Sequence, residues 1–254
     1  MNVNPYQPPS SSLDPPPAPV PAWSSADVFM PNGARASAAT ITLAICLIVD
    51  AATMFASIQR VRILGQIESG SFSMAAAERS DVLVQVASVF QILSVIGCAV
   101  AFCLWFHRAY SNLRALGVPT SFTPGWAPGS FFVPFLNLYR PYQIAKEIWV
   151  GSASNSTLAR EGLGHGLVGL WWGLYLGSNI ISNFAFRFQM DESAASLRTS
   201  TIVYIVSDIL SIGAALAAMS MIKGIERRQT QRYGEQRGVA GMDPSHQPFG
   251  SLPR

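Results

Sequence analysis

The sequence predicts an all-α membrane protein: a bundle of four transmembrane helices with one proline-broken re-entrant or short helix and one interfacial amphipathic helix. Three observations favour this fold class. Half of the 254 residues are hydrophobic. Only 12% are charged, against roughly a quarter in soluble domains. The hydrophobic residues also gather into long runs almost free of charge, which is typical of multi-pass membrane proteins.

Four of these runs are long enough to cross about 30 Å of hydrocarbon as helices. They cover residues 37–58, 82–106, 166–186 and 201–222. The second helix is expected to continue past the lipid to Gly117, because glycine followed closely by proline is a common helix stop. The last is expected to continue into the basic stretch IKGIERRQTQR.

The integral membrane domain is therefore expected at residues 35–232, with a disordered tail on either side. Residues 1–34 hold nine of the 17 prolines. Such a segment buries too little apolar surface to offset the entropy of ordering it. Residues 233–254 are rich in glycine and proline and are expected to fray.

Lysine and arginine indicate the orientation of the chain. With four spans and a cytoplasmic C-terminus, twelve of the 17 basic residues lie on the cytoplasmic side, as the positive-inside rule requires. The same ratio results if residues 122–139 form an additional span. Charge therefore predicts a cytoplasmic C-terminus but does not decide whether residues 122–139 cross the membrane.

Residues 122–139 are apolar enough to enter a membrane yet are rich in helix breakers. The charge-free stretch around them contains Pro119, Pro124, Pro128 and Pro134. Each proline removes a helical hydrogen bond, and unsatisfied backbone groups are costly in lipid. We therefore favour a short broken helix that dips in from the cytoplasmic face, with a fifth span as the alternative.

A second helix is predicted directly after this segment. Pro141 suits the first turn of a helix, where its missing N–H costs nothing. Ile144 and Ile148 share one side of the helix, with Tyr142 and Trp149 beside them. This pattern predicts an amphipathic helix that lies along the membrane interface.

Three blocks of the sequence resemble a known family. They read WFHRAYSNLRALG, FTPGWAPGSFFVPFLNLYRPYQIAKEIW and GLWWGLYLGSN, and they are similar to a bacterial multi-pass membrane family catalogued as domain-of-unknown-function family 4328. The pattern carried over includes Trp105, Arg108, Tyr110, Asn112, Leu113, Leu116, Gly117, Pro124, Gly125, Trp126, Ala127, Pro134, Asn137, Arg140, Pro141, Tyr142, Gln143, Glu147, Trp171 and Trp172. The resemblance implies a bacterial cell (inner) membrane protein with no assigned biochemical role.

A first candidate site lies near the cytoplasmic boundary and combines basic, amide and aromatic side chains. Its members are Arg108, Asn112, Trp126, Arg140, Tyr142 and Gln143. A folded-back element could bring Arg108, Arg140 and Gln143 around one anion. Guanidinium groups suit phosphate, and basic pockets at this face bind lipid head groups. The alternative is that the arginines only anchor the structure.

A second candidate site consists of two aspartates, Asp50 and Asp208, each near the middle of an apolar run. A charge at this depth is expensive and normally faces protein or a water-filled cavity. The two residues could form a proton or cation site between the first and last spans. Alternatively, each is protonated or hydrogen-bonded to neighbours such as Gln91 and Asn179, and only holds the helices in register.

Gly169, Gly173 and Gly177 recur every fourth residue. Such a small-residue stripe allows another helix backbone to approach closely. We expect it to mediate packing within the bundle or in a homodimer.

Several classes of function find little support. The cysteines Cys46, Cys98 and Cys103 lack the spacing of metal ligands, and no cofactor-binding motif is convincing. The net charge of +3 is too small to argue for nucleic acid. No catalytic motif is present, and the two aspartates lack a flanking pattern typical of intramembrane proteolysis.

The sequence therefore predicts a non-enzymatic membrane protein whose cytoplasmic-face motif binds a lipid head group or a partner protein. The alternative is a small proton- or cation-coupled transporter that uses Asp50 and Asp208. Expected partners are membrane lipids and, in addition, a membrane protein or a second copy of the chain. No metal, cofactor or nucleic acid is expected.

Overall fold

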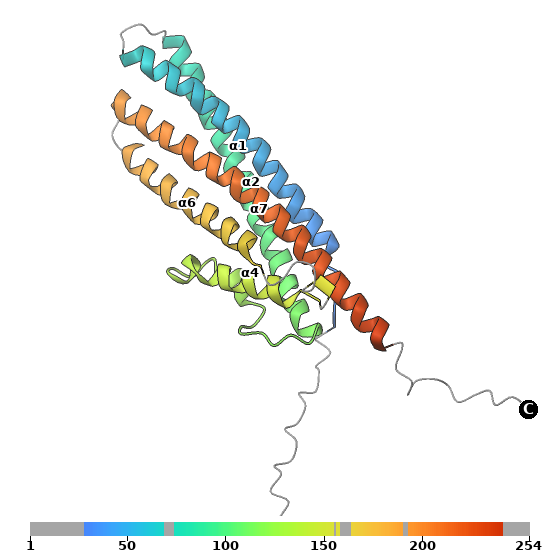
Figure 1. Cartoon of the computed structure of the whole chain (residues 1–254). Helices are drawn as coiled ribbons and strands as arrows, with labels where there is room; N and C mark the ends of the chain where they lie inside the picture. The colour runs from blue at the N-terminus through green and yellow to red at the C-terminus, as the bar shows by residue number, and fades with distance from the viewer. Residues whose placement is uncertain (1–27, 69–73, 155, 158–163, 190–192, 241–254) are drawn as a thin grey trace, which may run out of the picture.

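The computed structural model describes residues 28–68, 74–154, 156–157, 164–189 and 193–240, and all regular structure within them is helical. Four long helices run side by side (Figure 1). They are α1 (Gly33–Glu68), α2 (Met74–Ala115), α6 (Gly166–Gln189) and α7 (Ala194–Ala240). A shorter helix, α4 (Arg140–Gly151), lies across one end of this bundle (Figure 1).

The long helices form an arc rather than a closed ring. Helix α1 packs on α2 and on α7, and α7 packs on α6, but α2 and α6 do not pack along each other. The start of α1 and the end of α7 both lie at the end of the bundle that carries α4 (Figure 1). We call this end the α4 end.

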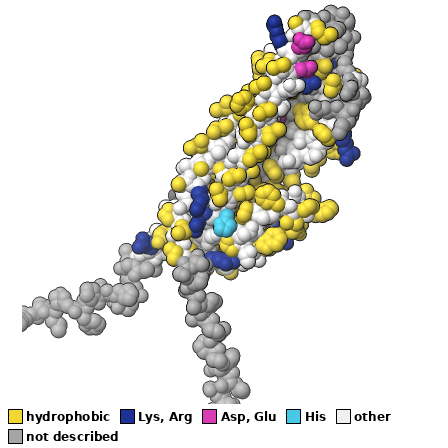
Figure 2. All heavy atoms as spheres, turned by 180° about the vertical axis from the view of Figure 1, so that it is seen from behind, with side chains coloured by type: hydrophobic (Ala, Val, Ile, Leu, Met, Phe, Trp, Pro, Cys, Tyr) yellow, Lys and Arg dark blue, Asp and Glu magenta, His cyan; other side chains and the backbone are white. Residues whose placement is uncertain are grey.

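Three of the four predicted spans are confirmed as helices long and apolar enough to cross a membrane. Their spans are Gly33–Gln66, Glu78–Ala115 and Ala195–Gly238. On the face shown in Figure 2, hydrophobic side chains cover most of the bundle and the basic side chains gather toward its two ends. Helix α6 is outside this set, because glycine, serine, asparagine and indole groups interrupt its apolar residues. Of the four predicted spans, three are therefore apolar enough by composition to cross a membrane, and α6 is not.

The predicted stop of the second span at Gly117 is confirmed. Helix α2 ends at Ala115, and Gly117 has a φ of 71°, in the left-handed region that glycine adopts without strain. The N–H of Val118 then donates to the carbonyl of Leu113 at 2.9 Å. This bond satisfies one of the carbonyls left free at the helix end.

Residues 122–139, here called the proline-rich segment, form only two short turns, α3 (Trp126–Gly129) and the 3₁₀ turn η2 (Leu136–Leu138). It packs on α2 and α4 and contains no helix long enough to cross a membrane. Two of its phenylalanines, Phe132 and Phe135, are 77% and 83% exposed. Phe135 also has a φ of 63°, which is unusual for a bulky residue.

Helix α4 begins where the sequence predicts, with Pro141 in its first turn. Its apolar side, however, is covered by protein. Ile144 and Ile148 are fully buried, and α4 packs against α2, α6 and α7. The apolar face therefore serves the core of the protein rather than contact with lipid, which corrects the role expected for it.

Both domain boundaries extend beyond the predicted residues 35–232. Phe29 stacks on Tyr233 with ring centroids 4.2 Å apart, so the chain is already packed ahead of α1. At the other end α7 continues to Ala240. The remaining parts of the predicted tails, residues 1–27 and 241–254, lie outside the described residues.

The glycine stripe of α6 makes little close contact with the other described helices. A Cβ atom added to Gly169 or Gly173 would meet no atom within 4 Å, and one on Gly177 would only touch Leu210 at 3.6 Å. Of the three glycines, only Gly177 lies within van der Waals reach of another described helix, α7. A homodimer contact through this stripe stays a prediction.

Candidate functional site

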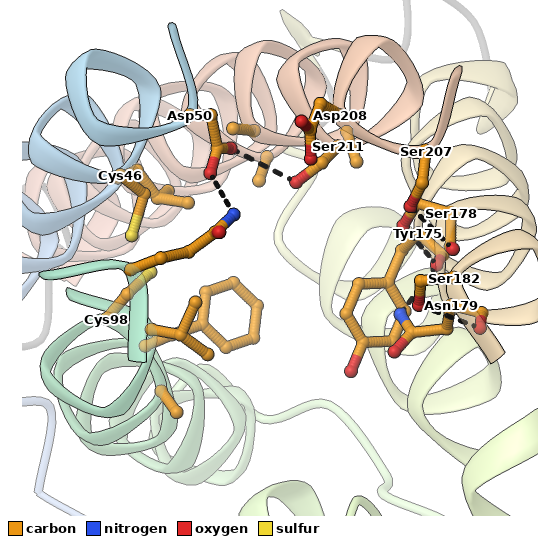
Figure 3. A pocket seen from close by; sticks show the side chains of 18 of the residues that line it. Cys46, Asp50, Cys98, Tyr175, Ser178, Asn179, Ser182, Ser207, Asp208 and Ser211 are labelled. Atoms are coloured by element: carbon orange, nitrogen blue, oxygen red, sulfur yellow. Dashed lines mark hydrogen bonds between the residues drawn. The ribbon is translucent and has the colours of Figure 1, made fainter. Parts of the chain in front are cut away.

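A cavity of about 620 Å³ lies between the four long helices. Figure 3 shows it surrounded by α1, α2, α6 and α7. Phe131 and Phe132 of the proline-rich segment also line it. Both intramembrane aspartates predicted from the sequence, Asp50 and Asp208, face this one space.

Asp50 is held by side chains of two other helices. Its side chain on α1 is 4% exposed. The amide Nε2 of Gln91 on α2 donates to Oδ1 at 3.0 Å, and the hydroxyl of Ser211 on α7 donates to Oδ2 at 3.3 Å (Figure 3). Burial of a carboxylate is costly unless such donors replace water. Through these two hydrogen bonds Asp50 links α1 to α2 and α7.

Asp208 lies one helical turn before Ser211 on α7 and is half-buried. No residue in the described part of the chain donates a hydrogen bond to it, so its acceptor capacity is available. It is close enough to Asp50 for the two charges to interact. The cavity thus holds one carboxylate already bound by the protein and one that is free.

Further polar groups come mainly from α6. The hydroxyl of Ser207 on α7 donates to the carbonyl of Ser178 on α6 at 2.9 Å, which ties these helices together beside the cavity. Asn179, expected as a neighbour of an aspartate, instead donates to the carbonyl of Tyr175 in its own helix at 2.8 Å. That part of the sequence prediction is wrong, whereas Gln91 is confirmed.

Aromatic rings line the end of the cavity nearest the proline-rich segment. Phe102 of α2 contacts Phe131 edge-on at 6.1 Å and Trp171 of α6 at 5.7 Å, measured between ring centroids. Among the described residues that line the cavity, none is Lys, Arg or His. The space therefore combines two carboxyl groups and aromatic rings with no lining cation to balance them.

Asn112, predicted as part of an anion site, serves the backbone instead. It is 1% exposed. Its Oδ1 accepts from the N–H of Met30 at 3.2 Å, and its Nδ2 donates to the Met30 carbonyl at 3.0 Å. Nδ2 also donates to Oε1 of Gln229 on α7 at 3.3 Å, so the side chain joins the N-terminal segment to α2 and α7.

The other members of this predicted cluster make no direct bond to one another among the described residues. The guanidinium of Arg140 lies over the ring of Phe122 at 4.4 Å, while Arg108 lies on α2. No hydrogen bond, ion pair or ring contact among the described residues joins Arg108, Arg140 and Gln143. Of the other members, Trp126 and Gln143 are exposed and Tyr142 is half-buried. Nε of Arg108 and of Arg140 is buried and has no hydrogen-bond partner among the described residues, so a shared anion site stays a prediction.

Tyr110 and Glu147 have a role that sequence reasoning did not assign. The Tyr110 hydroxyl donates to Oε2 of Glu147 at 3.0 Å and accepts from the N–H of Phe122 at 2.9 Å. Glu147 also accepts from the N–H of Ser121 at 2.6 Å. These bonds fasten the start of the proline-rich segment to α2 and α4. Both residues belong to the family pattern noted in the sequence, which is the feature that could have pointed to their role.

The basic end of α7 was also missed as a structural element. Nη1 of Arg232 donates to the carbonyls of Gly151 and Ala153, at 2.6 and 3.2 Å. Its Nη2 donates to the carbonyl of Leu116 at 3.3 Å. One side chain therefore caps the ends of α4 and α2, where free carbonyls favour cations. From the sequence alone, Arg232 and the other basic residues of this region indicated only the orientation of the chain in the membrane.

No group of three or more His, Cys, Asp or Glu side chains in the described part of the chain is placed to hold a metal ion. Three cysteines that line the cavity, Cys46, Cys98 and Cys103, are free thiols.

Comparison with known proteins gives one match. A family model described as "Domain of unknown function (DUF4328)" matches residues 68–227, from the end of α1 to within α7. The matched region includes Asp208 and the proline-rich segment, and Asp50 lies ahead of it. No curated protein and no solved structure matches the chain.

Proposed function

The chain belongs to the DUF4328 family, and from this premise we propose that it is a small proton- or cation-coupled transporter with its cation site between Asp50 and Asp208. One observation carries the proposal: two carboxyl groups from α1 and α7 line the same cavity among apolar helices. Intramembrane carboxyl groups are rare and commonly mark proton or ion pathways. The role is non-enzymatic.

The two aspartates would have different tasks. Asp50 is bound by Gln91 and Ser211, so it would fix the geometry of the site. Asp208 accepts no hydrogen bond within the described residues and would bind and release the cation or proton. Two acidic groups that interact across a low-dielectric cavity favour the binding of one compensating positive charge.

The proposal includes α6 as a fourth membrane crossing. A helix of 24 residues is about 36 Å long, enough to cross the hydrocarbon region. Its packing along α7 and its polar residues facing the cavity account for its lower hydropathy. We place the protein in the bacterial inner membrane with its C-terminus in the cytoplasm, on the side of the α4 end, following the positive-inside rule.

A flux measurement tests this function. Purified protein in proteoliposomes should dissipate an imposed proton or sodium gradient, and Asp208→Asn should abolish that flux. The matched control is Asp81→Asn, because Asp81 does not line the cavity and its side chain is 59% exposed. A wild type without any flux, or a flux unchanged by Asp208→Asn, would count against a transporter.

A second function, binding of an anionic lipid head group, is supported by Arg108 and Arg140, whose buried Nε atoms have no hydrogen-bond partner in the part of the chain that the structure describes. Each could donate to a phosphate oxygen from a lipid at the α4 end. Native mass spectrometry of the wild type and Arg140→Gln tests it. Retention of an anionic lipid by the wild type alone supports the role, and equal retention contradicts it.

A further inference from the structure

We propose that the cavity takes a lipophilic organic cation, a singly charged ammonium-type group on an aromatic or branched apolar body, which enters sideways from the bilayer between α2 and α6. This inference rests on the proposed function, because it names the class of substrate that the site between Asp50 and Asp208 would bind. The size, charge, lining and opening of the cavity carry it.

The size of the cavity argues against a bare inorganic ion as its sole occupant. Its volume of about 620 Å³ is within the range of roughly 300–1,000 Å³ that is typical of small-molecule sites. A proton or a sodium ion would leave nearly all of this space to be filled by water or lipid. An organic molecule fills it and exchanges its own apolar surface for that of the walls.

The charge of the lining selects the sign of the ligand. Within the described part of the chain, Asp50 and Asp208 are the acidic residues of the lining, and no Lys, Arg or His belongs to it. An anion would be repelled with no compensating contact. A single positive charge would meet Asp208, whose oxygens accept no hydrogen bond within the described residues.

The aromatic lining fits the body of such a molecule. Phe102, Phe131 and Trp171 form one wall, and Tyr175 and Tyr204 also line the space. Aromatic faces attract organic cations and bury their apolar groups at the same time. A strongly hydrated inorganic cation would gain little from these rings.

The opening of the cavity indicates the route of entry. Helices α2 and α6 do not pack along each other. Ala99 of α2 and Asn179 of α6 both line the cavity and are exposed at the surface. Beside this opening, Ile96 and Val100 of α2 are 57% and 56% exposed. Such an apolar rim faces hydrocarbon, so a ligand dissolved in the bilayer reaches the cavity without crossing water.

Binding of tetraphenylphosphonium to the purified protein tests the inference, with tetraphenylborate as an anion of nearly the same size and shape. We expect saturable binding of the phosphonium and none of the borate. Asp208→Asn should weaken phosphonium binding at least tenfold, whereas Asp81→Asn should leave it unchanged. Phe131→Ala provides a second cavity variant and should weaken binding several-fold. Circular dichroism and size-exclusion profiles establish that each variant is folded.

The route of entry needs its own pair of variants. Ala99→Trp places an indole at the opening and should slow association or reduce binding of the phosphonium. Leu104→Trp, at an exposed position of the same helix that is not part of the apolar rim, should have no effect because Leu104 does not line the cavity. Equal binding kinetics in both variants would overturn lateral entry.

Failure of the inference and failure of the proposed function give different results. Equal binding of both tetraphenyl ions, or phosphonium binding indifferent to Asp208→Asn, overturns the inference. An Asp208-dependent proton or sodium flux without phosphonium binding also overturns it, while the transporter stands. Asp208-dependent phosphonium binding without any flux supports the inference and overturns the transport function.

Discussion

Trp149 ties the α4 end together through each part of its side chain. Its indole N–H donates to the carbonyl of Gly164 at 2.7 Å, and the guanidinium of Arg228 lies 3.8 Å above its ring. Arg228 also donates to the Trp149 carbonyl at 3.0 Å. The indole ring packs against α7 at Gly224, which has no side chain and so leaves room for the ring. Because Trp149 is held by these contacts on several sides, a change in the residues around it is expected to affect the stability of the protein.

Gly224→Ala is predicted to destabilise the protein. A Cβ atom on residue 224 would lie 2.7 Å from Cζ3 of Trp149, so the ring or the helix would have to shift. Overpacking of this kind costs about 1–3 kcal/mol. Thermal unfolding in detergent should show a lower midpoint for Gly224→Ala, while Gly234→Ala, with no atom within 4 Å of its added Cβ, should not. An unchanged midpoint for Gly224→Ala would contradict the packing described here.

Asn112→Ala is predicted to loosen the segment that precedes α1. The substitution removes both hydrogen bonds to the backbone of Met30, each of which contributes about 0.5–1.5 kcal/mol. Hydrogen–deuterium exchange should become faster around Met30. The control is Asn183→Ala, because the Asn183 side chain is exposed and bonds only to the carbonyl of Asn179 in its own helix. If Asn112 instead binds an anion, exchange around Met30 would stay unchanged.

At the scale of elements, the proline-rich segment owes its shape to what holds it. Tyr110 and Glu147 fasten its start, and the indole of Trp172 donates to the carbonyl of Leu138 at 2.9 Å near its end. Between them Phe131 points into the aromatic wall, while Phe135 is 83% exposed. Prolines prevent a continuous helix, and anchors at both ends then favour a fixed, doubled-back loop with an apolar tip.

The tip at Phe135 is predicted to lie in lipid. A nitroxide label on Phe135→Cys, with the three native cysteines replaced by serine, should collide more often with oxygen than with a water-soluble nickel complex. A label on Lys146→Cys, at an exposed position of α4, should show the reverse, because a lysine side chain is already hydrated there. Accessibility of the Phe135 label to nickel alone would mean that the segment stays in water.

At the scale of the whole molecule, the arc of four helices leaves one side open. Helices α1 and α7 form its middle and share the contacts through Asp50, while α2 and α6 form its edges. The basic extension of α7 reaches beyond the others to cap α2 and α4. The result is a bundle closed at the α4 end by hydrogen bonds and open toward the side between α2 and α6.

Both chain ends are predicted to lie on the same side of the membrane. The start of α1 and the end of α7 are at the α4 end (Figure 1), and residues 122–139 contain no spanning helix. Alkaline phosphatase fused to either terminus should be inactive in cells, and a fusion between α1 and α2 should be active. Opposite activities at the two termini would require an odd number of spans.

Much of this fold could be read along the chain. Hydrophobic run length predicted α1, α2 and α7, and local chemistry placed the stop at Gly117 and the start of α4 at Pro141. These features depend on neighbours a few residues away. The sequence also placed α6 correctly as a helix. Its polar residues line the cavity and lower its hydropathy, and the length of the apolar run alone does not reveal that role.

The sequence by itself determined that this chain is helical, apolar enough for a membrane and a member of its family, because composition and local motifs carry that information. It also singled out Asp50 and Asp208, since a carboxyl group in an apolar run is conspicuous. Only the tertiary structure decided that the two face one cavity, that Ser211 binds Asp50, and that Asn112 holds a backbone segment rather than an anion. Those facts depend on which helices become neighbours, and 161 residues separate Asp50 from Ser211 along the chain.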